Sequence, residues 1–136
     1  MKMFLGEYQP NITEGSRIAL PKKMREQIQG KTVILSRGIE KCIFVYDLED
    51  WRTEAQKQVD NKEENAKRRD IERYLFATAV EVAIDAQGRM VLPSTLLDYA
   101  QINEETAVVG VGERIEIWDR ALWKEHFEKI STQLAV

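Results

Sequence analysis

The sequence predicts an α+β fold, mainly β, that is assembled from two similar halves. Three observations support this prediction: an internal repeat, short apolar runs separated by turn residues, and a helix that begins with proline in each half. The chain has 136 residues, which is enough for one compact domain or two very small ones.

The internal repeat is the strongest of these observations. When the chain is compared with itself at an offset of 72 residues, similar residues coincide in order and without a gap. Two halves that share so many positions are expected to fold alike. The matching pairs are Phe4 and Phe76, Ile12 and Ile84, Arg17 and Arg89, Leu20-Pro21 and Leu92-Pro93, Gly38 and Gly110, Ile43 and Ile115, Asp47 and Asp119, and Trp51 and Trp123.

The second half shows its first elements clearly. Residues 80–84 alternate between apolar and less apolar side chains, which predicts a strand. Residues 85–88 then predict a turn, because Gly88 can adopt a positive φ and the Asp85 side chain can accept hydrogen bonds from backbone N–H groups that follow it.

Each half continues with a short helix and a pair of strands. Pro21 and Pro93 stand at the expected first helical positions, where the missing N–H of proline costs nothing. In the first half we expect a helix over 21–29 and strands over 32–36 and 42–46. In the second half we expect a strand over 89–92, a helix over 93–100 and strands over 106–111 and 114–118.

An amphipathic helix is expected to close each half, with Asp47 and Asp119 as N-caps. Apolar residues recur at helical spacing along one stripe of each helix, and we interpret both stripes as core packing. The stripes are Leu48, Trp51, Ala55 and Val59 in the first helix, and Trp123, Phe127, Ile130 and Leu134 in the second.

A charged segment, residues 56–73, joins the two halves. The spacing of Ile71, Tyr74, Leu75 and Thr78 predicts that its C-terminal part is helical. It contains the basic triplet Lys67-Arg68-Arg69, for which a solvated helix face is the default interpretation; a phosphate contact and an inter-subunit salt bridge are the alternatives.

The composition excludes several classes of function. No stretch approaches the ~20 apolar residues of a membrane span, and the apolar run near the N-terminus is too short for a signal peptide, so we expect a cytoplasmic protein without a membrane partner. Cys42 is the single cysteine and His126 the single histidine; no metal site is expected, and Cys42 is interpreted as a buried strand residue. No nucleophile and base, phosphate-binding loop or metal cluster points to an enzyme.

Charge is distributed unevenly along the chain. The net charge is −3, yet residues 16–25 carry four cations and no acidic residue. One face can therefore be basic although the whole molecule is acidic.

Because each half has little core of its own and leaves strand edges exposed, pairing of the halves and further pairing between chains are both expected.

The segment Asp85-Ala86-Gln87-Gly88-Arg89-Met90-Val91-Leu92-Pro93 resembles the D-x-x-G-R-x-x-x-P signature of the AbrB/MraZ swapped-hairpin superfamily. Four further segments, 3–8, 20–26, 37–42 and 110–118, resemble the corresponding parts of the MraZ family, so that the resemblance covers about residues 3 to 127.

This resemblance implies a specific fold. Members of the family consist of two AbrB-like swapped-hairpin halves, whose strands interlock into a small pseudo-two-fold, double-ψ-like β-barrel with flanking helices. The resemblance also implies a division of the chain into a first half over 3–55, a charged helical linker over 56–75 and a second half over 76–130.

The resemblance also implies a function. A protein of this family is a sequence-specific DNA-binding transcriptional regulator without a cofactor or small-molecule ligand, cytoplasmic and associated with the nucleoid. It binds direct repeats in the promoter of the bacterial division and cell-wall gene cluster as a ring-shaped homo-oligomer, an octamer or larger. Loops that carry the D-x-x-x-R arginines face the DNA, mainly in the first half; the candidate DNA-binding residues are Arg17, Ser16, Gly15, Asn11, Arg89, Lys22 and Lys23.

The first turn departs from the family pattern. It reads Thr13-Glu14-Gly15-Ser16-Arg17, where the family has Asp, a basic residue and a small residue at positions 13, 15 and 16. Arg17 alone matches, which leaves open whether the turn still supports specific binding. The alternative function is a swapped-hairpin interaction or scaffold module, similar to an antitoxin, that does not bind DNA specifically.

Overall fold

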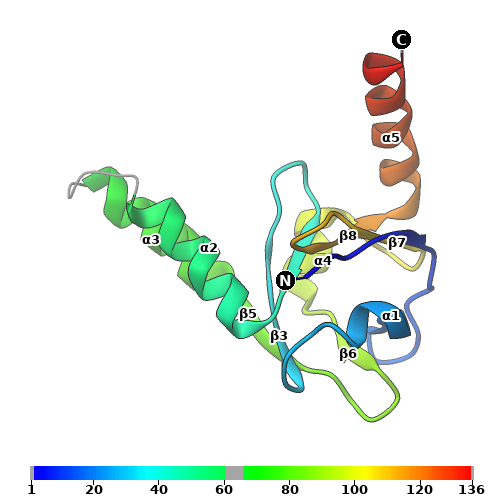
Figure 1. The fold of residues 1–136 in the computed structure, drawn as a ribbon, viewed down its shortest axis with the longest axis horizontal. Helices are drawn as coiled ribbons and strands as arrows, with labels where there is room; N and C mark the ends of the chain where they lie inside the picture. Colours follow the sequence, from blue (N-terminus) through cyan, green and yellow to red (C-terminus); the bar gives the residue numbers. More distant parts are fainter. Residues whose placement is uncertain (1, 61–65, 136) are drawn as a thin grey trace.

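The computed structural model describes residues 2–60 and 66–135 (Figure 1). They form a mixed α/β structure with mostly short, antiparallel strands and five described helices. The strands are β1 (Glu7–Tyr8), β2 (Arg17–Ala19), β3 (Thr32–Arg37), β4 (Ile43–Tyr46), β5 (Val80–Ala83), β6 (Arg89–Val91), β7 (Thr106–Gly110) and β8 (Ile115–Asp119); the helices are α1 (Lys22–Arg25), α2 (Leu48–Asp60), α3 (Ala66–Thr78), α4 (Ser94–Ala100) and α5 (Arg120–Leu134).

The strands form an open sheet and a separate ribbon. Six strands pair in the order β1-β7-β8-β4-β3-β5, and β2 pairs with β6. The predicted closed barrel is not found among the described residues, since β1 and β5 remain the edges of the larger sheet. β5 pairs only with β3 in this sheet, and after the turn between Asp85 and Arg89 the next strand, β6, pairs with β2 in the separate ribbon.

The two halves interlock through their strands. Four of the six strand pairings, β1–β7, β2–β6, β3–β5 and β4–β8, join a strand of the first half to one of the second. Ile18 faces Met90 in the ribbon and Phe44 faces Glu116 in the sheet. Both pairs join residues that are equivalent in the repeat, so a local two-fold relation passes through each of them.

The repeat contains a one-residue slip that the sequence comparison missed. Ile34 faces Tyr46, whereas Thr106, its counterpart at the 72-residue offset, faces Asp119 rather than Trp118. The hairpin between β7 and β8 is one residue shorter than that between β3 and β4, which moves Gly110 out of register with Gly38.

A second repeat pair, Phe4 and Phe76, is also not equivalent in the structure. Phe4 is buried and bridges Gly112, whereas Phe76 lies exposed on α3. The repeat therefore does not extend to these two positions.

The main core fills the space between the larger sheet, the ribbon, α1 and α4. Ile18 and Met90 point inward from the ribbon, and Met24 and Leu96 come from the two short helices. Burying each side chain of this kind stabilises the fold by roughly 1.5–3 kcal/mol. The prediction that Cys42 is buried is confirmed, because its side chain lies in a smaller cluster with Trp118, but Cys42 precedes β4 and is not a strand residue.

The short helices follow the prediction with one correction. The helix expected over 93–100 is confirmed as α4, although Pro93 is its N-cap rather than its first residue. The helix expected over 21–29 ends at Arg25. Beyond that residue the backbone N–H groups of Gln27 and Ile28 bond carbonyls three residues back, which tightens the chain into a turn.

The first closing helix packs only partly as predicted, because Leu48 is exposed and Trp51 is half-buried. α2 and α3 form a helical hairpin in which Ala55 and Val59 are buried, and the helical prediction for the C-terminal part of the linker is confirmed by α3. Asp47 caps α2 by accepting the N–H of Asp50 at 3.0 Å. Residues 61–65 of the linker lie outside the described residues.

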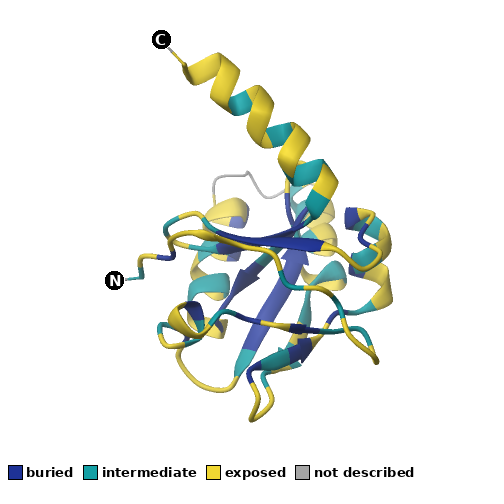
Figure 2. Cartoon of the chain, turned by 90° about the vertical axis from the view of Figure 1, so that its right-hand side faces the viewer, coloured by how far each residue is buried: buried dark blue, intermediate teal, exposed yellow. Residues whose placement is uncertain are grey.

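The second closing helix corrects the prediction. Asp119 caps α5 by accepting the N–H of Leu122, as expected. However, α5 projects away from the body and no residue of it is buried (Figure 2). Of the predicted stripe, only Trp123 packs against the core, beside Trp118; the prediction is wrong for Phe127 and Leu134, which are exposed. None of the described helices is long and apolar enough to cross a membrane.

Candidate nucleic-acid interface

The second-half turn has the geometry that its sequence predicts. The Asp85 Oδ1 atom accepts hydrogen bonds from the N–H groups of Gln87 and Arg89, both at 2.9 Å, and Gly88 has a φ of +79°. These hydrogen bonds hold the pKa of the Asp85 carboxyl below its ordinary value, and the bond from the Arg89 N–H has the largest effect. The carboxylate thus stays ionised and keeps the turn closed at neutral pH.

Arg89 leaves this turn with a partly neutralised charge. Its Nε atom lies 3.1 Å from Asp85 Oδ2, and the two side chains remain 38% and 39% exposed. The guanidinium is therefore both ion-paired and accessible to solvent. A phosphate that binds there must compete with the carboxylate of Asp85 for the same cation.

The first-half turn closes by a different arrangement. Thr13 and Arg17 exchange backbone hydrogen bonds of 2.8 and 3.3 Å, and the Thr13 hydroxyl also donates to the Arg17 carbonyl. Gly15 and Ser16 both adopt positive φ, at 80° and 58°. Two successive residues with positive φ thus reverse the chain in the first turn. In the second turn, Gly88 and the hydrogen bonds to Asp85 reverse it instead.

Arg17 differs from Arg89 in its electrostatic surroundings. Its Nη1 atom donates to the carbonyl of Glu14 at 3.2 Å, which fixes the guanidinium over its own turn. Among the described residues, no carboxylate lies within salt-bridge distance of it. Replacement of the usual aspartate by Thr13 therefore leaves a full positive charge on the first turn.

The ribbon places both turns on one surface. Arg17 faces Val91 and Ala19 faces Arg89, while Ile18 and Met90 point into the core. Because side chains alternate along a strand, the two arginines share the outer face. Reciprocal bonds extend the ribbon at both ends: the Leu20 N–H donates to the Gly88 carbonyl and the Leu92 N–H to the Ser16 carbonyl, at 3.0 and 2.8 Å. We call residues 13–19 and 85–91 together the turn–ribbon surface.

Helix α1 adds cations beside this surface, at the end of the molecule away from α5 (Figure 1). Lys22 and Lys23 are exposed. The Arg25 Nε donates to the Leu20 carbonyl of its own half at 2.9 Å, and the Arg25 guanidinium lies against buried Gly88 in the turn of the other half. Arg25 was not among the candidate residues. Only the interlocking of the halves brings it to the second turn, and no local sequence signal indicates that.

Asn11 lies in a different environment from the other candidates. Its side-chain oxygen accepts from Arg120 at 2.8 Å, and it lines a depression with Glu104, Glu105 and Asp119. The structure brings together the other six candidates, Arg17, Ser16, Gly15, Arg89, Lys22 and Lys23, but places Asn11 among acidic residues. A DNA contact by Asn11 stays a prediction.

The chemistry available on the turn–ribbon surface is recognition by cations. A guanidinium there can clamp a phosphate or pair bidentately with guanine, and the lysines of the neighbouring α1 attract phosphate as point charges. Within the described ranges, no group of three or more His, Cys, Asp or Glu side chains is placed to hold a metal ion.

Comparison with known proteins places this arrangement in a family. The family model described as the MraZ protein, with the added term antitoxin-like, matches twice, over residues 3–73 and 75–135. Proteins named "Transcriptional regulator MraZ" are similar over most of both chains: that of Clostridium tetani is 39% identical over 91% of this chain and 87% of its own, that of Moorella thermoacetica 37% over 96% and 91%, and that of Pediococcus pentosaceus 35% over 93% and 88%. The two matches correspond to the two interlocked halves, and the chain therefore belongs to the MraZ family.

Proposed function

We propose that this protein is a sequence-specific transcriptional regulator that binds double-stranded DNA through the turn–ribbon surface. The observation that carries the proposal is the placement of Arg17 and Arg89 on the outer face of one antiparallel ribbon. The major groove of B-DNA is ~12 Å wide and admits a two-stranded ribbon. The names of the relatives support regulation as the biological role.

The finer proposal follows the family resemblance. The two halves adopt swapped-hairpin folds, for which the exchange of strands between halves is the supporting observation. The targets are direct repeats in the promoter of the division and cell-wall gene cluster, bound by a ring-shaped homo-oligomer of eight or more copies at the nucleoid in the cytoplasm. Repeated sites suit such an assembly, because linked weak contacts gain ~10²–10⁴ in affinity.

DNase footprinting tests this proposal. The probe is the region upstream of the gene for this protein, with an unrelated fragment of equal length as the control. Protection of short repeated sequences, and of none in the control, is the expected result. Uniform protection of both fragments, or of neither, would contradict specific recognition.

An interaction module without specific DNA binding is the second candidate, favoured by the term antitoxin-like in the family description and by the altered first turn. It predicts no footprint at physiological salt together with stable capture of a protein partner. The same footprint therefore separates the two functions.

A further inference from the structure

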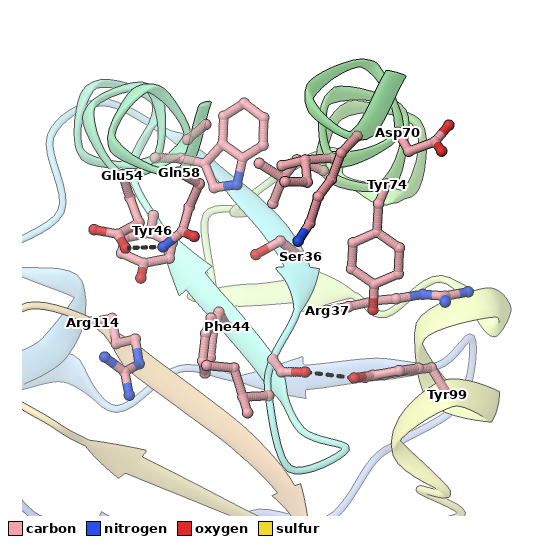
Figure 3. A pocket seen from close by; sticks show the side chains of 17 residues that line it. Ser36, Arg37, Phe44, Tyr46, Glu54, Gln58, Asp70, Tyr74, Tyr99 and Arg114 are labelled. Atoms are coloured by element: carbon pink, nitrogen blue, oxygen red, sulfur yellow. Dashed lines mark hydrogen bonds between the residues drawn. The ribbon is translucent and has the colours of Figure 1, made fainter. Parts of the chain in front are cut away.

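A cavity of about 760 Å³ lies between the helices α2 and α3 and the β3–β4 hairpin (Figure 3). Small-molecule sites in proteins enclose ~300–1,000 Å³ and are lined mostly by apolar and aromatic side chains. Both helices line this cavity with residues at helical spacing, so each helix turns one face to it. The apolar and aromatic lining comprises Phe44, Tyr46, Trp51, Ile71, Tyr74 and Leu75. The cavity therefore has the size and the lining of a site for a small organic molecule.

The apolar lining of the cavity is incompletely packed. Phe44 on β4, Trp51 on α2, and Ile71 and Leu75 on α3 are all only half-buried. A ligand that replaces water on these side chains removes apolar surface from water, which is favourable. Aromatic rings dominate the lining, and such rings gain further stabilisation when another ring packs against them edge to face or offset. The lining therefore favours a ligand with an aromatic body.

A buried hydroxyl lies on the floor of the cavity. Ser36 is 7% exposed and faces Phe44, another lining residue, across the β3–β4 pair. Figure 3 shows Ser36 on the sheet between the two helices. Within residues 2–60 and 66–135, its hydroxyl has no hydrogen-bond partner. A buried polar group without a partner costs free energy, and a ligand atom that accepts from this hydroxyl removes that cost.

Arg37 brings a cation to the rim of the cavity. Its guanidinium carbon lies 4.8 Å from the centroid of the Tyr99 ring and 5.7 Å from that of the Tyr74 ring. Both tyrosines line the cavity, so the guanidinium lies beside its opening (Figure 3). Cation–π contacts of this kind hold the guanidinium in place but leave its positive charge available to an anion.

The charges around the cavity favour an anionic ligand. Five charged side chains line it, of which Arg114 and Asp70 have ion-pair partners. Arg37, Lys67 and Glu54 have no ion-pair partner in the described part of the chain. Glu54 belongs to α2, whereas Arg37 lies on the opposite side, towards α3 (Figure 3). The α3 side of the cavity therefore has two unpaired cations and no unpaired carboxylate.

We propose that this cavity binds a small amphipathic anion, a molecule with an aromatic body and one acidic group. The acidic group pairs with the cations Arg37 and Lys67, a polar atom accepts from the Ser36 hydroxyl, and the aromatic body packs against Phe44 and Trp51. The inference goes beyond the family resemblance, which implies no small-molecule ligand. It does not depend on DNA binding, so each of the two proposals can fail without the other.

Fluorine NMR of the full chain labelled with fluorotryptophan tests the site, with naphthoate as the probe. Of the three tryptophans, Trp51 lines the cavity, whereas Trp118 and Trp123 donate their indole N–H groups to Glu116 and Glu7 elsewhere. We expect naphthoate to shift the Trp51 signal saturably and to leave the other two in place. Trp51→Phe identifies the signal. A Trp51 signal that does not move, as when another protein chain covers the cavity, or an equal shift of all three signals, would overturn the proposal.

Two further probes test the chemistry of the ligand without altering the protein. Naphthamide has the same rings but no charge, and we expect it to bind at least ~10-fold more weakly than naphthoate, because hydrogen bonds to charged groups are the stronger ones. Laurate has the charge but an alkyl body, and we expect it to bind more weakly than naphthoate as well. Equal affinity for naphthoate and naphthamide would exclude an anion site, and tighter binding of laurate would contradict the aromatic body.

Variants locate the site on the chain. We expect Arg37→Gln to weaken naphthoate by ~10-fold and to leave naphthamide unchanged, since only the charged contact is lost. Arg52→Gln is the matched control, because Arg52 is exposed on α2 outside the cavity and pairs with Glu49. Phe127→Ser removes an exposed apolar side chain of α5 and is expected to bind like the wild type. Circular dichroism checks that all variants are folded. Loss of binding in Phe127→Ser, or unchanged naphthoate affinity in folded Arg37→Gln, would refute the assigned site.

Discussion

Two arginines at repeat-equivalent positions have different electrostatic surroundings. Asp85 pairs with Arg89, whereas the Arg17 guanidinium, within the described part of the chain, donates only to the Glu14 carbonyl of its own turn. We expect Arg17→Ala to lower affinity for the promoter repeats by ~10–100-fold, since a bidentate base contact is worth ~1–3 kcal/mol. Arg89→Ala should weaken binding less or lower the melting temperature instead.

Fluorescence anisotropy and thermal melting, measured on the same samples, distinguish these outcomes. Arg52→Ala is the matched control, because Arg52 is exposed on α2 and pairs only locally with Glu49. Wild-type affinity in Arg17→Ala would refute the role assigned to Arg17.

The Asp85 carboxylate is expected to stabilise the fold in a pH-dependent way. Its pKa is lowered in the folded state, so its stabilisation is fully present above the ordinary carboxyl pKa of 3.8 and is lost as pH falls through the lowered value. Asp85→Asn should therefore melt at a lower temperature than the wild type at pH 7, and the two melting curves should converge in strong acid. A difference that stays constant from pH 7 to pH 2 would contradict this assignment.

At the scale of elements, the N-terminal segment crosses β7 at a residue that must be small. A Cβ on Gly110 would approach backbone atoms of Phe4 and Leu5 to less than 3.0 Å, and the Gly110 N–H donates to the Gly6 carbonyl. We expect Gly110→Ala to lower the free energy of unfolding by ~1–3 kcal/mol, the typical cost of overpacking. Urea denaturation measures this change, and an unaltered midpoint would show that the segment can move aside.

Local signals in the sequence predicted local structure well. The turn at Asp85, the helix after Pro93 and the caps at Asp47 and Asp119 form as predicted, because each depends on hydrogen bonds within a few residues. Of the candidate site, Arg17 and Arg89 were found from their turn motif, and the structure places them on one surface.

The errors arose where distant parts of the chain decide the outcome. Amphipathic spacing predicts that α5 buries a stripe but not what covers it. A repeat offset cannot reveal that one hairpin is a residue shorter, and strand spacing alone does not show whether a sheet closes. Arg25 on the second turn and Asn11 against Arg120 depend on contacts between the halves, for which a single sequence has no signal.

For the whole molecule, the net charge of −3 is compatible with DNA binding because α1 adds three cations beside the turn–ribbon surface, whose two arginines are balanced by Glu14 and Asp85. Counterion release then makes binding strongly dependent on salt. We expect Lys22→Gln and Lys23→Gln each to reduce the slope of log affinity against log salt by about one, because each lysine neutralises one phosphate. The reduction should be the same for specific and scrambled DNA. Loss of sequence preference without a change in slope would show that these lysines read bases instead.

The most direct test of the central claim is a titration of the wild-type protein against two labelled duplexes at several salt concentrations. One duplex holds the promoter region upstream of its own gene, and the other holds the same bases in scrambled order. We expect tight, salt-dependent binding that favours the promoter by at least ~10³-fold at physiological salt. Equal affinity for both duplexes would contradict sequence-specific recognition by the turn–ribbon surface.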